Sequence, residues 1–235
     1  MNVVANLAEQ VVLITGAKGG LGSAVTRACL DAGASVAGTS RSIVDADFAR
    51  PRFTAFPADL SDSAAVARMT EAVVAKFGRI DALIHVAGGF AGGKPLYETD
   101  EATWESMMNV NARAAFHILH AVIPHMRQAG KGRIAAIGSR AGVQPTANIA
   151  VYGASKAALV SLVQTVALEN RDLGITANVI LPGTIDTKVN RQFDATAGNS
   201  TWIAPERLAA LAVFLISGDA AQITGAAIPV YGAQL

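Results

Sequence analysis

Short, continuous apolar runs recur along the chain at intervals that suit an alternation of strands and helices. Runs without a polar residue at every second position are typical of strands buried on both faces of a parallel sheet. We expect seven strands, at residues 11–14, 34–39, 53–56, 82–87, 133–137, 176–181 and 226–230. Segments with helical periodicity lie between them, at residues 23–30, 63–77, 104–126, 152–169 and 205–217. The pattern predicts one α/β domain over residues 1–235, a doubly wound parallel sheet with helices on both faces.

The composition narrows the class of protein. Of the 235 residues, 51% are hydrophobic and 16% are charged, which excludes a disordered chain. The formal net charge of +1 provides no attraction for nucleic acid or an anionic membrane, so we expect a small-molecule substrate. The single cysteine, Cys29, lies in an apolar helical pattern. We also find no secretion-type leader and no apolar run of about 20 residues. Together with the single cysteine, this favours a cytoplasmic protein.

The first strand ends in a glycine-rich loop. Gly16, Gly20 and Gly22 follow the strand and precede a helix. Glycine lets the backbone turn sharply and approach a ligand, and a helix N-terminus favours a pyrophosphate. The spacing differs from the commonest dinucleotide fingerprint. Strand, loop and helix in this order nevertheless favour a dinucleotide cofactor, with Lys18 and Leu21 also in the loop.

The exit of the second strand indicates which dinucleotide is bound. An acidic side chain there usually binds the free ribose hydroxyls of NAD, whereas an arginine accommodates the 2′-phosphate of NADP. This chain has Ser40 and Arg41 at that point, and Lys18 supplies a second positive charge. These residues favour NADP(H) over NAD(H), although Arg41 also suits an ordinary solvated loop. Asp59 and Leu60, after the third strand, are further candidate cofactor contacts.

The middle of the chain adds a flexible loop and a buried amide. Glycines after the fourth strand, within residues 88–93, permit the backbone to lie against a ligand. Asn111 lies in an apolar helical pattern and needs a partner, so we expect it to hold a water or to bend the helix near the site. Three histidines follow without a nearby acid or thiol cluster, so no metal site is expected; they are His117, His120 and His125.

Ser139, Tyr152 and Lys156 suggest proton-transfer chemistry. Tyr152 and Lys156 are four residues apart, which on a helix places them on one face. A nearby ammonium lowers the pKa of a phenol toward the useful range. Ser139 follows the fifth strand, at the sheet edge where ligands bind in open α/β folds. The three residues fit ketone reduction or alcohol oxidation, whereas a tyrosine and lysine at this spacing are alone usually an ordinary helix pair.

The last third of the chain contributes a lid and a candidate interface. Pro182 and Gly183 end the sixth strand, and Ile185 and Thr187 follow. The polar stretch at 188–203 predicts an irregular substrate lid. The helix at 152–169 is apolar on nearly every side, which predicts that a second copy covers part of it in a homodimer or homotetramer.

Together these motifs resemble the short-chain dehydrogenase/reductase family over essentially the whole chain. The resemblance implies a Rossmann-type fold and hydride transfer between a nicotinamide and a carbonyl/alcohol pair. It also implies that Tyr152 is the general acid/base and that Ser139 holds the substrate oxygen. Lys156 would lower the pKa of Tyr152 and bind the ribose, and Asn111 would place a water. The expected cofactor contacts are Gly16, Lys18, Gly20, Leu21, Gly22, Ser40, Arg41, Asp59, Leu60, Ala87, Gly88, Tyr152, Lys156, Pro182, Gly183, Ile185 and Thr187.

Two departures from the family pattern leave alternatives open. Val86 stands where the family usually has asparagine, and Gly138 stands where a second serine is common. The stretch at 86–93 resembles the quinoid dihydropteridine reductase branch, which typically lacks the serine found here as Ser139. The alternatives are therefore a reductase of that type and, from another class, a non-catalytic NADP(H)-binding scaffold or sensor.

Overall fold

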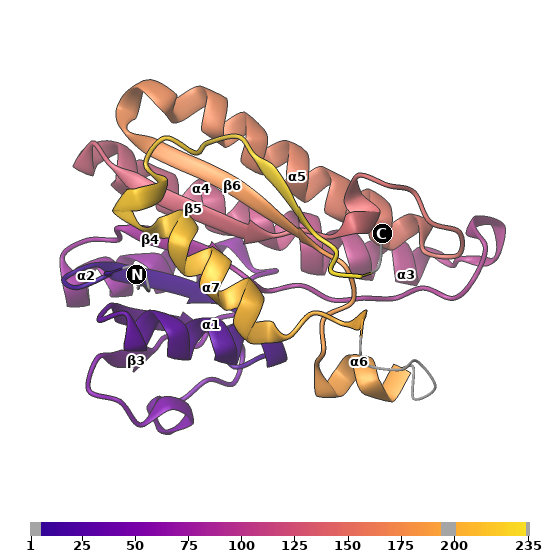
Figure 1. The fold of residues 1–235 in the computed structure, drawn as a ribbon, viewed down its shortest axis with the longest axis horizontal. Coiled ribbons are helices and arrows are strands. Elements are labelled where there is room, and N and C mark those ends of the chain that lie inside the picture. Colours follow the sequence, from indigo (N-terminus) through magenta and orange to yellow (C-terminus); the bar gives the residue numbers. More distant parts are fainter. Residues whose placement is uncertain (1–5, 194–200, 234–235) are drawn as a thin grey trace.

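Seven parallel strands form one sheet in the computed structural model, which describes residues 6–193 and 201–233 (Figure 1). The strands are β1 (Val11–Thr15), β2 (Ser35–Thr39), β3 (Phe53–Ala55), β4 (Ala82–His85), β5 (Gly132–Ile137), β6 (Ile175–Pro182) and β7 (Ala227–Val230). Their order across the sheet is β3-β2-β1-β4-β5-β6-β7. The direction of progression reverses between β1 and β4, the position at which open α/β sheets form a ligand crevice.

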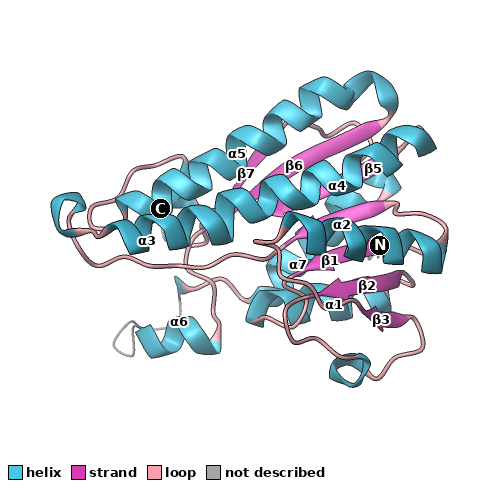
Figure 2. Ribbon diagram, turned by 180° about the vertical axis from the view of Figure 1, so that it is seen from behind, coloured by secondary structure: helices cyan, strands magenta, loops and turns pink. Residues whose placement is uncertain are grey.

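Helices cover both faces of the sheet. They are α1 (Gly20–Asp31), α2 (Ser63–Phe77), α3 (Glu101–Met107), α4 (Ala114–Ala129), α5 (Ala150–Asn170), α6 (Lys188–Phe193) and α7 (Pro205–Ile216). Helices α1 and α7 pack on one face, and α2, α4 and α5 pack on the other (Figures 1 and 2). Each face has its own apolar core, so the central strands are buried on both sides. The doubly wound Rossmann-type prediction is confirmed.

The helix predicted at 104–126 is interrupted. It consists of α3, a π-helical turn at Met108–Arg113, and α4. A π-helical turn inserts an extra residue into the helix and is frequent at functional sites. Asn111 lies inside this turn and is fully buried. The helix predicted at 104–126 is thus present but contains a π-helical turn, at the place where Asn111 was expected to hold a water or to bend the helix.

The predicted lid is more regular than its polar sequence suggests. Residues 188–193 form α6, and residues 194–200 lie outside the described part of the chain. The segment returns to the sheet at Ile203, which pairs with Ile185 in a short parallel bridge. The backbone N–H of Asp186 donates to the Ile203 carbonyl at 2.9 Å, and that of Ile203 donates to the Thr184 carbonyl at 2.9 Å. Helix α6 stands out from the body of the molecule (Figure 1).

Helix α5 is a core helix with one exposed side. By length and composition alone, the segment that begins with α5 could cross a membrane. Its sheet-facing residues, among them Leu159 and Val163, are instead buried against the β5–β6 side of the sheet. Leu168 lies on the opposite side and is 69% exposed. The helix is therefore not covered on every side within one chain.

Candidate active site

A cleft of about 1410 Å³ follows the carboxyl ends of the strands. Its lining begins at the glycine loop after β1, passes the residues that follow β2 to β4, and reaches the residues after β5 and β6. Every residue predicted for the site lines this cleft except Asn111 and Thr187. Asn111 is buried behind the loop at Gly89. Thr187 packs against the glycine loop, because a Cβ added to Gly20 would lie 2.9 Å from its methyl group.

The glycine loop leaves no room for side chains at two of its glycines. Gly16 has a φ of +65°, and a Cβ there would lie 2.9 Å from the backbone of Ala87. A Cβ on Gly22 would lie 1.9 Å from the Gly16 carbonyl oxygen. Helix α1 begins at Gly20 with no side-chain cap and no acidic residue in its first turn. Its first N–H groups can therefore receive an anion, and this end of the cleft fits the pyrophosphate of a dinucleotide.

Thr15 joins the glycine loop to the end of β4. Its hydroxyl oxygen accepts the backbone N–H groups of Val86 at 3.1 Å and Ala87 at 3.2 Å. It also lies 2.8 Å from Nδ1 of His85. A threonine hydroxyl has two acceptor positions and one proton, so this proton is donated to His85. Thr15 thus connects the ends of β1 and β4. Val86 has no side-chain amide that could do so in place of the asparagine usual in the family.

This network assigns the tautomer of His85. Because Nδ1 accepts from Thr15, the ring proton lies on Nε2. His85 is buried, and desolvation together with the charge of Lys156 lowers its pKa to about 3. The imidazole is therefore neutral at physiological pH. Its buried Nε2 has no hydrogen-bond partner among the described residues.

Asn111 connects the loop after β4 to helix α5. Its amide oxygen accepts the Gly89 N–H at 3.1 Å, and its Nδ2 donates to the Gly89 carbonyl at 3.0 Å. The same Nδ2 donates to Oγ of Ser155 at 3.0 Å, and the Ser155 hydroxyl donates to the Tyr152 carbonyl at 2.8 Å. Both amide protons are therefore used within the protein. The side chain braces the loop against the helix that carries Tyr152.

Tyr152 and Ser139 meet in the cleft. Ser139 follows β5 and lines the cleft together with Tyr152, and its hydroxyl accepts the Ala141 N–H at 3.2 Å. The ring of Phe90 packs edge-on against Tyr152, with 5.0 Å between the ring centroids. Burial raises the pKa of Tyr152, and the nearby Ser139 side chain partly offsets this effect. The lowered pKa expected from a neighbouring lysine is thus not found, because desolvation of the phenol dominates.

Lys156 is a buried cation one helical turn beyond Tyr152. Its side chain is directed to the sheet, where Nζ donates to the Ile137 carbonyl at 3.1 Å. Gly88 passes close to it, since a Cβ there would lie 3.1 Å from Nζ and 2.7 Å from the amide oxygen of Asn111. Burial lowers the pKa of Lys156 to about 8. Lys156 and Gly88, which line the cleft, and Asn111 behind them therefore form one tightly packed group.

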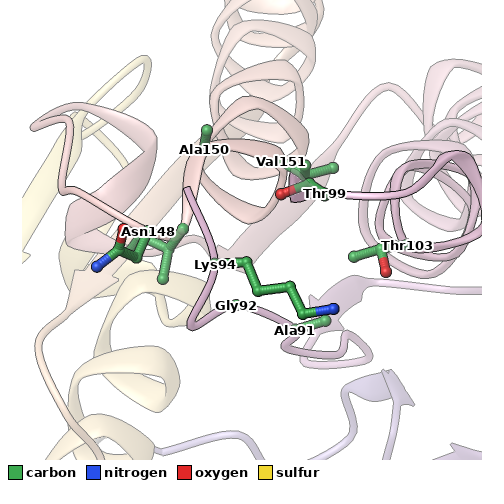
Figure 3. A pocket seen from close by; sticks show the side chains of 9 residues that line it. Ala91, Gly92, Lys94, Thr99, Thr103, Asn148, Ala150 and Val151 are labelled. Atoms are coloured by element: carbon green, nitrogen blue, oxygen red, sulfur yellow. The ribbon is translucent and has the colours of Figure 1, made fainter. Parts of the chain in front are cut away.

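A smaller cavity of about 110 Å³ lies beside the cleft. Ile149 borders both spaces. The Lys94 side chain lies between Asn148 and Thr103 in this cavity (Figure 3). The N–H of Gly93 donates to the Asn148 carbonyl at 2.8 Å, and a Cβ on Gly92 would lie 2.6 Å from the Ile149 side chain. These later glycines of the 88–93 stretch thus dock the loop onto the segment that precedes α5.

The site geometry agrees with the comparisons to known proteins. Residues 10–198 match the family model described as short chain dehydrogenase. The chain belongs to the short-chain dehydrogenase/reductase family. The 3-oxoacyl-[acyl-carrier-protein] reductase FabG of Escherichia coli strain K12 is 31% identical, over 97% of this chain and 98% of the relative.

Solved structures of other short-chain dehydrogenases superimpose closely on this one. The structure titled ElxO with NADP bound has a TM-score of 0.90 at 26% identity, covering 96% of this chain and 98% of the other. The structure of the 3-ketoacyl-(acyl-carrier-protein) reductase from Brucella melitensis complexed with NADH also has a TM-score of 0.90, at 27% identity. It covers 97% of this chain and 99% of the other. Relatives of this oxidoreductase fold therefore bind either nicotinamide dinucleotide.

Sequence reasoning placed Thr15 at the start of the cofactor loop of this short-chain dehydrogenase but missed its contact with His85. The signal for Thr15 was its position as the last residue of a strand, directly before a glycine. His85 carried no such signal, because a histidine within an apolar run is usually a core residue with satisfied hydrogen bonds. His85 contacts Thr15 because the parallel pairing of β1 and β4 places the two residues opposite each other.

Proposed function

We propose that the protein is an NADP(H)-dependent oxidoreductase that interconverts a small-molecule ketone and the corresponding alcohol. The observation that carries this proposal is that Ser139, Tyr152 and Lys156 line one cleft, with Ser139 close enough to Tyr152 to lower the pKa of its phenol. Lys156 lies one turn further along α5, and the glycine loop lines the opposite end of the same cleft. The named activity of FabG, reduction of a 3-oxoacyl group, supports a ketone substrate.

Each residue has a role that its position supports. Tyr152 donates a proton to the carbonyl oxygen during reduction and receives it during oxidation. Ser139 holds that oxygen beside the phenol. The bound cofactor supplies or accepts the hydride at its nicotinamide ring. Lys156, one helical turn beyond Tyr152, provides a positive charge in the same site. Asn111 holds the loop at Gly89 against helix α5.

Three further proposals accompany this function. Arg41 and Lys18 line the cleft beyond β2 and favour NADP(H) over NAD(H). The exposed apolar residues Phe116 on α4 and Leu168 on α5 favour a homodimer or homotetramer. A cytoplasmic location stays a prediction from the sequence.

Replacement of the phenol tests the proposal. We expect Tyr152→Phe to lower kcat/KM for a panel of ketones with NADPH by a factor of about 100 or more, because the proton donor is lost. NADPH affinity measured by calorimetry should stay within about twofold of wild type, since the ring is retained. Tyr97→Phe is the matched control, because Tyr97 is 85% exposed. Undiminished turnover by Tyr152→Phe would contradict the proposal.

The same experiments separate the alternatives. A scaffold or sensor would bind NADPH without oxidising it in the presence of any ketone. The quinoid dihydropteridine reductase alternative is not favoured, because Ser139, which that branch typically lacks, lines the cleft together with Tyr152. Ser139→Ala should therefore impair ketone reduction, whereas a pterin reductase should tolerate it.

A further inference from the structure

An ion pair lies beside the part of the cleft that follows β2, between Lys18, which lines the cleft, and Asp47, which does not. Nζ of Lys18, in the glycine loop, lies 3.0 Å from Oδ1 of Asp47. The same ammonium donates to the Ser42 carbonyl at 3.2 Å. Asp47 belongs to a short 3-10 helix, Asp45–Phe48, that follows β2. The ammonium expected to meet the cofactor is therefore already engaged by a carboxylate from the neighbouring segment.

The carboxylate is the fixed member of this pair. Oδ2 of Asp47 accepts the backbone N–H of Val44 at 2.9 Å. The helix that carries it is anchored by Phe48, which is buried and stacks against Phe53 with 4.8 Å between ring centroids. The Asp47 side chain is 21% exposed and that of Lys18 is 43% exposed. Lys18 is the member that can reorient, because it has a long flexible stem.

The charges around this region determine how strongly it can bind a phosphate. Lys18 and Arg41 both line the cleft there. The Val44 N–H and Lys18 hold the pKa of Asp47 below its usual range, so the carboxylate is charged at neutral pH. Asp59 is likewise held ionised, mainly by its hydrogen bonds with Ser61 and in a smaller part by the charge of Arg41. Acidic groups therefore offset both cations.

A 2′-phosphate entering this region must compete with Asp47 for Lys18, whereas a ribose with free hydroxyls brings no negative charge to that position. We propose that Asp47 is a cofactor-selectivity residue: it restrains Lys18 and so weakens the binding of NADP(H) relative to NAD(H). The inference rests on the proposed function, because it requires that the cleft bind a nicotinamide dinucleotide.

Binding measurements with two matched variants test this inference. Asp47→Asn removes the charge but keeps an oxygen that can accept the Val44 N–H. Asp45→Asn is the control, because Asp45 lies in the same short helix and its carboxylate instead accepts the Ala55 N–H at 2.7 Å. Dissociation constants for NADPH, NADH, adenosine 2′,5′-bisphosphate and 5′-AMP are measured by calorimetry for wild type and both variants.

We expect Asp47→Asn to bind NADPH and the bisphosphate about three- to fivefold more tightly, the effect of one partly exposed ion pair. Its affinity for NADH and 5′-AMP, and all affinities of Asp45→Asn, should stay within about twofold of wild type. Lys18→Met should weaken NADPH binding and abolish the gain in the Lys18→Met, Asp47→Asn double variant.

Unchanged NADPH affinity in Asp47→Asn would overturn the inference, as would equal tightening of NADPH and NADH. Both results leave the proposed function intact. A wild-type protein that binds neither dinucleotide would instead refute the proposed function, and the inference with it.

Discussion

Lys156 is a buried cation whose charge makes stability depend on pH. Its side chain is almost entirely buried, and its pKa falls from 10.5 to about 8 because burial penalises the charged form. Between these two values the unfolded chain holds a proton that the folded chain has released. The free energy of unfolding therefore rises with pH across this window, since the unfolded state binds more protons there.

Lys156→Met removes this dependence. Between pH 7.5 and pH 9.5 we expect the free energy of unfolding of wild type to rise by about 2 kcal/mol relative to the variant. Urea denaturation at the two pH values gives the comparison. Lys76→Met, in the last turn of α2, serves as the control and should follow wild type. If wild type and Lys156→Met change in parallel, Lys156 does not have a lowered pKa in the folded protein.

The residue identities of the site could be predicted from the sequence, but their energetics could not. Ser139, Tyr152 and Lys156 were found from their spacing, and all three line the cleft. The pKa of Tyr152 was expected to fall because a lysine follows it, yet burial raises it. How deeply a phenol is desolvated depends on residues such as Phe90, which is distant in sequence and packs on the ring.

At the scale of elements, one hydroxyl connects the glycine loop to the end of β4. Thr15 accepts the N–H groups of Val86 and Ala87 and donates to His85. We expect Thr15→Val to lower the free energy of unfolding by about 1–3 kcal/mol, because it leaves the buried His85 ring and the part-buried Ala87 N–H without their partner. Denaturant unfolding measures this loss.

Thr54→Val is the matched control for the Thr15 variant. Thr54 lies on the short strand β3 and is partly exposed. The same replacement there should change the free energy of unfolding by less than about 0.5 kcal/mol. A Thr15→Val protein as stable as this control would show that the hydroxyl does not hold the two strands together.

The strands were predictable and the π-helical turn was not, for a physical reason. Strands buried on both faces must be apolar throughout, so their sequences identify them locally. The turn at Met108–Arg113 is accompanied by contacts of Asn111 with Gly89 and Ser155, which are remote in sequence. A helical pattern by itself does not reveal that such partners exist. Helix α6 was missed for a different reason: its residues are mostly polar and show no apolar periodicity.

At the scale of the whole molecule, α4 and α5 lie in one helical layer (Figure 2), and some apolar side chains of these helices are exposed. Phe116 is 51% exposed and Leu168 is 69% exposed. If a second copy covers this layer, Leu168→Glu should place a charge in the interface and shift the protein toward monomers. Light scattering after size-exclusion chromatography measures the mass.

Leu96→Glu is the control for this substitution, because Leu96 is 65% exposed and belongs to a different segment, Leu96–Glu98. It should leave the mass unchanged. An unaltered oligomer in Leu168→Glu, with unchanged circular dichroism, would place the subunit contact elsewhere.

The bridge between Ile185 and Ile203 has a consequence for how this enzyme can diversify. The two hydrogen bonds that flank it are made by backbone groups, and within residues 188–193 the Asn190 side chain adds a bond to the Ile185 carbonyl at 2.8 Å. Lengthening a segment whose ends are already held together costs little, because closure entropy grows slowly with length. We therefore expect that the segment can be exchanged or extended without alteration of the sheet, and that such a change would alter substrate range if the segment forms the predicted lid.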